Sequence, residues 1–228
     1  MSATLIIQEP EAAAGQLILL FHGVGGAPES LSALGQALAA KFPAAKVVSV
    51  AAPERFEYGQ GYQWFSVAEL SESNRPERVA QAMPAFRDEV LRWQRLSGVA
   101  AAATALIGFS QGAIMCLEST QQGEPLAGRV IALSGRFAVP PMRAPKETTL
   151  HLVHGKTDAV IPYALTVQAA ERLIPMGADL TADVIPFVGH EINEAVIERV
   201  IARLNSYVPK RLWDEALSSE ASLVDGKP

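Results

Sequence analysis

The sequence has little cysteine, few charges and no long hydrophobic run. Its only cysteine, Cys116, rules out an internal disulfide and fits a reducing compartment. Charged residues make up 19% of the chain, the net charge is −5, and Lys and Arg form no cluster, so nucleic acid is not an expected partner. The apolar stretch LILLF at 17–21 follows no basic cluster and is too short to span a membrane. We therefore expect a cytoplasmic protein with no signal peptide and no stable membrane insertion.

Apolar residues make up 49% of the chain, which is enough for a sizeable core. Short runs rich in Val, Ile and Leu alternate with stretches of helical periodicity, which predicts a mostly parallel sheet covered by helices on both faces. The expected strands are 4–8, 16–21, 46–50, 104–109, 129–134, 149–154 and 181–187. The expected helices are 29–41, 76–97, 111–122, 163–175 and 191–207. Because no composition shift marks a linker, we expect a single domain over residues 1–217 and a flexible tail over 218–228.

The stretch 51–75 is the longest without periodicity. Loops of this length inside a compact domain are usually either functional or disordered. This one carries several aromatic side chains, among them Tyr58, Tyr62, Trp64 and Phe65. The aromatic content predicts an ordered segment that forms the wall of a pocket.

The motif GFSQG places Ser110 between two glycines, directly after an expected strand and directly before an expected helix. Taken alone, the motif is equally compatible with an ordinary turn serine. At a strand-to-helix junction, however, flanking glycines let the helix approach the strand closely. The side chain of Ser110 then projects above the carboxyl edge of the sheet, where open α/β folds bind ligands. Ser110 is therefore a candidate nucleophile.

A serine hydroxyl needs a base, and the base needs an orienting acid. Of the four histidines, only His190 lies in a loop after the last expected strand. Asp158 follows the preceding strand, whereas Asp179 and Asp183 lie at the start of the last strand, at the opposite edge of the sheet from Ser110. We therefore favour Asp158 as the acid and His190 as the base. Because the base must be neutral to accept a proton, activity is expected to fall on acidification.

An ester hydrolase also stabilises an oxyanion with hydrogen-bond donors. The backbone N–H of Gln111, at the start of a helix, is one natural donor. The backbone N–H of Val24, in the glycine loop HGVGG at 22–26, is another. We expect His22 to hold this loop in a structural role.

Each candidate has a simpler structural explanation. Asp158 fits an N-cap or turn position, and His190 fits a surface or capping histidine. Their occurrence together with Ser110, each at a strand end, favours the catalytic interpretation.

Other ligand motifs are incomplete. Gly23 and Gly25 begin a dinucleotide fingerprint, but Pro28 stands where the third glycine is needed. The run GKT at 155–157 lacks the glycine that a phosphate loop requires at position 150, which is Leu150. No histidine, cysteine and carboxylate cluster has metal-ligand spacing. We expect no cofactor and no metal.

The motifs LLFHGVGG, QWFS, ALIGFSQGAIM, HLVHGKTDAVIP and VGHEI occur in this order over about residues 17–195. Together they resemble the phospholipase/carboxylesterase family of α/β-hydrolases, which includes small bacterial carboxylesterases and acyl-protein thioesterases. The resemblance implies a three-layer α/β-hydrolase fold with a mostly parallel sheet of about seven strands and no large lid. It also implies that Ser110, Asp158 and His190 form a catalytic triad.

The same resemblance implies an oxyanion hole made by the N–H groups of Val24 and Gln111. It places Trp64 and Phe65 in the wall of the acyl pocket, and it allows a homodimer. The sequence departs from the family at Ser66, where relatives commonly carry an acid. This departure bears on substrate preference and not on the triad.

These observations predict a carboxylesterase that cleaves small carboxylic esters through an acyl-enzyme. The nearest alternative is an acyl-protein thioesterase or lysophospholipase, which shares the triad and acts on longer acyl chains. An alternative of another class is a non-catalytic α/β-hydrolase that binds a ligand. Such proteins usually lose a member of the triad, and none is missing here.

Overall fold

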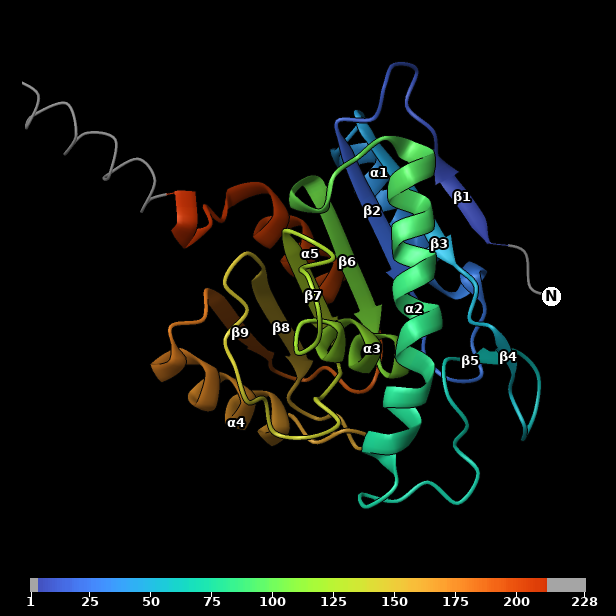
Figure 1. Cartoon of the computed structure of the whole chain (residues 1–228), viewed down its shortest axis with the longest axis vertical. Coiled ribbons are helices and arrows are strands. Elements are labelled where there is room, and N and C mark those ends of the chain that lie inside the picture. The colour runs from blue at the N-terminus through green and yellow to red at the C-terminus, as the bar shows by residue number, and fades with distance from the viewer. Residues whose placement is uncertain (1–3, 213–228) are drawn as a thin grey trace, which may run out of the picture.

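A seven-stranded sheet forms the centre of the computed structural model, which describes residues 4–212 (Figure 1). The expected tail over 218–228 lies outside the described residues. The strand order is β1-β3-β2-β6-β7-β8-β9, and only the β1–β3 pairing is antiparallel. The strands are β1 (Leu5–Gln8), β2 (Gln16–Phe21), β3 (Ala45–Val50), β6 (Thr104–Phe109), β7 (Arg129–Leu133), β8 (Thr149–Gly155) and β9 (Leu180–Ile185). The predicted mostly parallel sheet is confirmed.

Helices cover both faces of this sheet. They are α1 (Ser32–Lys41), α2 (Arg75–Ser97), α3 (Gln111–Ser119), α4 (Ala164–Leu173) and α5 (Glu194–Ser206). Short 3-10 helices precede α1 (Pro28–Leu31), precede β6 (Ala101–Ala103) and follow α4 (Ile174–Met176). In Figure 1, α2 crosses in front of the sheet, whereas α1 and α5 lie behind it. The three layers match the predicted α/β-hydrolase architecture.

After their first residue, the central strands β2, β6 and β7 are apolar, because both of their faces are buried. In β2, Leu17, Leu19 and Phe21 pack against α2 and α3, whereas Ile18 and Leu20 pack on the side of α1 and α5. All five side chains are at most 2% exposed. Burying one such side chain contributes about 1.5–3 kcal/mol to the free energy of unfolding. Because alternate residues of β2 face opposite sides of the sheet, this strand stabilises the packing of both helical layers.

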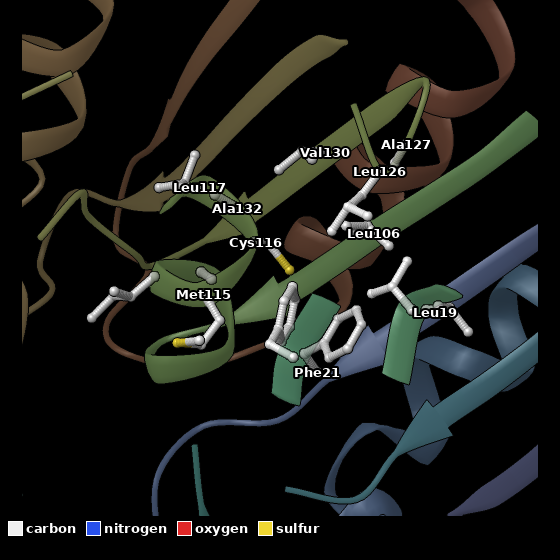
Figure 2. Close-up of a cluster of buried hydrophobic side chains, with 14 of the residues drawn as sticks. Leu19, Phe21, Leu106, Met115, Cys116, Leu117, Leu126, Ala127, Val130 and Ala132 are labelled. Carbon is white, nitrogen blue, oxygen red and sulfur yellow. The ribbon is translucent and has the colours of Figure 1, made fainter. Parts of the chain in front are cut away.

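Cys116 lies in the layer between α3 and the sheet, among side chains that include Leu106 and Val130 (Figure 2). It is fully buried, and burial raises the pKa of its thiol well above the ordinary value. The protonated thiol is therefore a packing group and not a nucleophile.

The segment between β3 and α2 is ordered, as its aromatic content predicts. It contains the short hairpin strands β4 (Glu54–Arg55) and β5 (Tyr62–Gln63). The backbone of Tyr62 exchanges hydrogen bonds with the glycine loop after β2, accepting from the N–H of Gly25 at 2.9 Å and donating to the carbonyl of Gly26 at 2.8 Å. Gly61 has φ +90°, and a Cβ there would overlap the Gly25 carbonyl, so only glycine fits this approach.

A buried histidine lies on β8, far from the carboxyl edge of the sheet. His151 is 0% exposed, and its Nδ1 lies 2.9 Å from the Thr181 hydroxyl. Burial and the positive charges of Arg129 and Arg203 lower the pKa of His151 to about 4. In the unfolded chain this imidazole takes up a proton near pH 6.5, so the unfolded state binds the proton first as the pH falls. His151 therefore destabilises the folded state progressively between pH 6.5 and 4.

We predict that His151→Asn flattens the loss of stability in mild acid. Asparagine keeps a polar group near the Nδ1 position but cannot titrate. Between pH 7.5 and 4.5, the wild type should lose about 2 kcal/mol more unfolding free energy than the variant. Urea unfolding at pH 7.5 and at pH 4.5 measures the unfolding free energy of the wild type and of the variant. The variant will be less stable at pH 7.5 through lost packing, so only the two pH differences are compared. Equal differences would contradict the prediction.

Candidate active site

Ser110 occupies the sharp turn between β6 and α3. Its backbone has φ 51° and ψ −113°, a region that non-glycine residues rarely adopt. The N–H of Ser110 donates to the carbonyl of Leu133 in β7 at 2.9 Å, which anchors the turn to the neighbouring strand. The side chain is thereby held at the carboxyl edge of the sheet.

The glycines on either side of Ser110 are required by close backbone approach. A Cβ at Gly108 would overlap the backbone of Gly112, and a Cβ at Gly112 would overlap the carbonyl of Phe21 in β2. Helix α3 can therefore start directly above β6 and β2 only with glycine at both positions. The predicted role of the flanking glycines is confirmed.

The side chains of Ser110, His190 and Asp158 form a continuous hydrogen-bonded chain. His190 Nε2 lies 3.0 Å from Ser110 Oγ, and His190 Nδ1 lies 2.7 Å from Asp158 Oδ2. A carboxylate only accepts, so Nδ1 carries the proton and Nε2 is free to accept from the serine hydroxyl. The three residues follow β6, β9 and β8, and the fold brings together a serine and a histidine 80 positions apart.

Asp158 is held as a carboxylate. Its Oδ1 accepts from the backbone N–H groups of Val160 and Ile161, each at 2.9 Å. Burial by itself would raise the pKa of Asp158, but the hydrogen bonds from His190, Ile161 and Val160 outweigh it and lower the pKa. The group is 8% exposed and ionised at neutral pH, as an orienting acid must be.

His154 is a second histidine beside this carboxylate. Its Nε2 lies 2.7 Å from the carbonyl of Ile161 and 3.2 Å from Asp158 Oδ2, and its Nδ1 lies 2.7 Å from the Thr166 hydroxyl. Burial lowers the pKa of His154, so the ring is neutral and donates through Nε2. Its hydrogen bonds close the end of β8, as its position at a strand end predicts, and they hold the turn that carries Asp158.

The two competing carboxylates lie elsewhere and are paired elsewhere. Asp183 makes a two-bonded ion pair with Arg203, at 2.6 and 2.8 Å. Asp179 accepts from the hydroxyls of Tyr207 and Thr149 at 2.5 and 2.7 Å. Neither contacts His190.

The glycine loop after β2 passes directly beside Ser110. A Cβ at Gly23 would lie 3.2 Å from the Ser110 Cβ. The next residue, Val24, lines the same cavity as Ser110 and Gln111. The N–H of Gln111, the first residue of α3, has no acceptor four residues earlier within the helix. The two expected donors thus come from the loop and the helix that border the serine.

His22 fixes that loop. Its Nε2 accepts from the N–H of Ala52 at 3.2 Å, so its Nδ1 carries the proton and donates to the carbonyl of Gly23 at 2.8 Å. Burial lowers the pKa of His22, which keeps the ring neutral. The expected structural role of His22 is confirmed.

The side chain of Gln111 joins α3 by hydrogen bonds to the segment that carries Trp64 and Phe65. Its Oε1 accepts from the N–H of Trp64, and its Nε2 donates to the carbonyl of Phe65, both at 2.7 Å. Gln111 is 3% exposed, so both polar atoms of its amide are buried, and each has a partner in the aromatic segment. The sequence analysis did not predict this contact, and the only signal for it is a polar residue at the start of a helix whose next six residues are not polar.

The family resemblance implies that Trp64 belongs to the wall of the acyl pocket, and in the structure its ring packs in the core next to that wall. Its indole N–H donates to the carbonyl of His22 at 2.9 Å, and its ring packs edge-on against Phe21 and Phe86. Phe65 borders the cavity beside Ser110, but Trp64 does not. The larger ring fills the core between the sheet and α2, and so supports the pocket wall from behind.

Two cavities open beside Ser110 and His190. The first, which we call the inner cavity, has a volume of about 470 Å³ and is largely apolar. Its lining includes Ser110, Phe65, Leu70, Ile114, Ile161 and Leu165. The second, the loop-side cavity, has a volume of about 360 Å³ and is bordered by the glycine loop, Phe109 and His190. Val24 borders both, so the loop separates them.

Within residues 4–212, no group of three or more His, Cys, Asp and Glu side chains could hold a metal ion. No helix in the same range is long and apolar enough to cross a membrane.

Comparison with known proteins identifies the family. Residues 2–208 match the family described as phospholipase/carboxylesterase. The chain is 47% identical to "Esterase YpfH" of Escherichia coli K12 over 98% of this chain and 94% of that protein. It is 28% identical to "Acyl-protein thioesterase 1" of Neurospora crassa over 63% and 62% of the two chains. The crystal structure of esterase PE8 superimposes with a TM-score of 0.81 at 28% identity, covering 91% of this chain and 98% of that one. The chain therefore belongs to the phospholipase/carboxylesterase family.

Proposed function

We propose that the protein is a serine esterase that hydrolyses small carboxylic esters through an acyl-enzyme. Ser110 is the nucleophile, His190 the general base and Asp158 the orienting acid. The observation that carries the proposal is the hydrogen bonding of the His190 ring to Ser110 Oγ at 3.0 Å and to Asp158 Oδ2 at 2.7 Å. The similarity to an esterase of Escherichia coli supports it.

In the first half-reaction, Ser110 Oγ attacks the ester carbonyl carbon and His190 Nε2 takes the hydroxyl proton. The imidazolium that forms is stabilised by the Asp158 carboxylate at its Nδ1 side. The oxyanion accepts from the N–H groups of Val24 and Gln111. As the intermediate collapses, His190 gives its proton to the leaving alcohol and Ser110 remains acylated.

In the second half-reaction, water repeats the same steps. His190 takes a proton from water as the water oxygen attacks the acyl carbon. Collapse of the second intermediate breaks the bond to Ser110 Oγ, and the proton returns from His190 to the serine. The products are a carboxylic acid and the free, reprotonated enzyme.

The two cavities suit the two parts of an ester. The inner cavity begins at Ser110 and is largely apolar, which fits an acyl group. The loop-side cavity borders His190, which must reach the leaving oxygen, so it fits the alcohol. The acyl group and the alcohol then lie on opposite sides of Val24.

A thioesterase or lysophospholipase acting on longer acyl chains is the second candidate. The apolar inner cavity of about 470 Å³ favours it, because an acetyl group would fill only part of that volume. A panel of acetyl, butyryl, octanoyl and palmitoyl esters, each as the oxygen ester and the thioester, separates the two candidates. A non-catalytic ligand-binding protein predicts no turnover across the panel and no fluorophosphonate labelling of Ser110.

We predict that Ser110→Ala lowers kcat/KM for a butyryl ester by at least about a thousandfold, because no nucleophile remains. Fluorophosphonate labelling should be lost as well. Ser119→Ala is the matched control, since Ser119 lies at the other end of α3 and its hydroxyl contacts the backbone. Full esterase activity in the Ser110 variant would disprove the mechanism.

We predict that Asp158→Asn lowers kcat by about ten-thousandfold at neutral pH. The carboxamide can donate to Nδ1 of His190, which favours the tautomer whose Nε2 carries a proton and cannot accept from Ser110. Asp183→Asn, at one of the two other carboxylates considered, should keep its activity. A larger effect at Asp183 than at Asp158 would reassign the acid.

We predict that Gln111→Ala raises KM more than it lowers kcat. The backbone N–H at position 111 remains, but the N–H of Trp64 and the carbonyl of Phe65 lose buried partners, which loosens the wall of the inner cavity. The variant should also lose about 1–3 kcal/mol of unfolding free energy. Gln81→Ala, at an exposed glutamine of α2, is the control. A stability loss with KM unchanged would reduce Gln111 to a purely structural residue.

A further inference from the structure

Charged side chains form one part of the lining of the inner cavity. Most of its lining is apolar, but three charged side chains, Glu72, Arg75 and Arg136, border it. Arg136 donates to both carboxylate oxygens of Glu72, from Nη1 at 3.0 Å and from Nη2 at 2.8 Å. Arg75 donates to the same carboxylate at 2.5 Å. One carboxylate thus holds two guanidinium groups at the edge of an apolar space.

A third cavity lies on the other side of Arg136. This outer cavity has a volume of about 500 Å³ and is bordered by Val139, Pro140 and Pro141 together with residues of α4. Arg136 and Leu165 line both the inner and the outer cavity. A side chain that lines two cavities lies between them, so these two residues form the partition.

The segment that carries Arg136 is held to α3, the helix that begins after Ser110. Glu118, on α3, accepts from the N–H of Ala138 at 2.6 Å. Arg136 itself donates from Nε to the carbonyl of Phe137 at 3.1 Å. The backbone next to Arg136 is therefore anchored to the helix that begins after Ser110.

We propose that the Arg136–Glu72 ion pair is the end wall of the acyl site and sets the longest acyl chain that the enzyme accepts. The inference rests on the proposed function, because it places the acyl group in the inner cavity. A chain that fills the inner cavity stops at the guanidinium of Arg136, since an apolar terminus cannot replace its bonds to Glu72. Without the wall, the chain continues into the outer cavity.

Of the two residues in the partition, Arg136 is the one that can be substituted without disturbing the fold. Leu165 is part of α4, whose other face packs against the sheet. The Glu72 side chain is 70% exposed, and ion pairs with an exposed partner contribute little to stability. Glu72 also keeps Arg75 as a partner after Arg136 is removed. Substitution of Arg136 therefore opens the wall and leaves the fold in place.

The test compares the acyl-chain profile of the wild type with that of Arg136→Ala. The measurement is kcat/KM for p-nitrophenyl esters with acyl groups of increasing length from acetyl to palmitoyl. In the variant, the ratio of long-chain to butyryl kcat/KM should rise by roughly fourfold for each further methylene that becomes buried. Glu72→Gln, which weakens the bonds to Arg136 without removing its volume, should shift the profile in the same direction by less.

Arg92→Ala is the matched control, because Arg92 also donates two hydrogen bonds to one carboxylate, that of Glu89, from its Nε and Nη2, and it lies on the exposed side of α2. Its chain-length profile should equal that of the wild type. An unchanged profile in Arg136→Ala, or an equal loss at every chain length, would overturn the inference. Fluorophosphonate labelling of Ser110 and turnover of the butyryl ester by the wild type test the proposed function separately. If both occur and the profile is unchanged, only the end wall is refuted.

Discussion

The close approach of α3 to β6 and β2 determines where every other part of the site can lie. Gly108 and Gly112 bring the backbone of the helix against the strands, and Ser110 is forced into a turn with positive φ between them. That turn holds the hydroxyl at the carboxyl edge of the sheet, directly before the first residue of α3. The loops after β8 and β9 then need only reach the same edge, where Asp158 and His190 complete the hydrogen-bonded chain.

Local patterns along the chain predicted much of this arrangement. The central strands β2, β6 and β7 are largely apolar runs, and the carboxyl ends of parallel strands gather at one edge of a sheet. Ser110, Asp158 and His190 could therefore be expected to lie together from their positions after three strands. The glycines beside Ser110 indicated a close approach of helix and strand, because glycine has no Cβ that would keep the two backbones apart.

What could not be predicted depends on contacts between segments that carry no local signal. The orientation of Trp64 follows from the space between Phe21 and Phe86, which exists only once α2 lies on the sheet. The bond between Arg136 and Glu72 joins residues 64 positions apart, and nothing near either one in the sequence indicates its partner. Motifs thus reveal the atoms proposed for the reaction, and tertiary packing shapes the space around them.

Gln111 contributes to both parts of the site at once. Its backbone lies at the start of α3, whereas its side chain holds the segment that carries Phe65. A side chain substituted at this position would lose the bonds to Trp64 and Phe65 at the residue that directly follows Ser110, so a change of pocket shape made there would disturb the segment next to the serine as well. The stretch that includes Leu70 and Glu72 borders the inner cavity but does not adjoin Ser110 in the sequence. Related enzymes with different substrates are therefore expected to diverge first between β5 and α2, and to keep the residue after the serine unchanged.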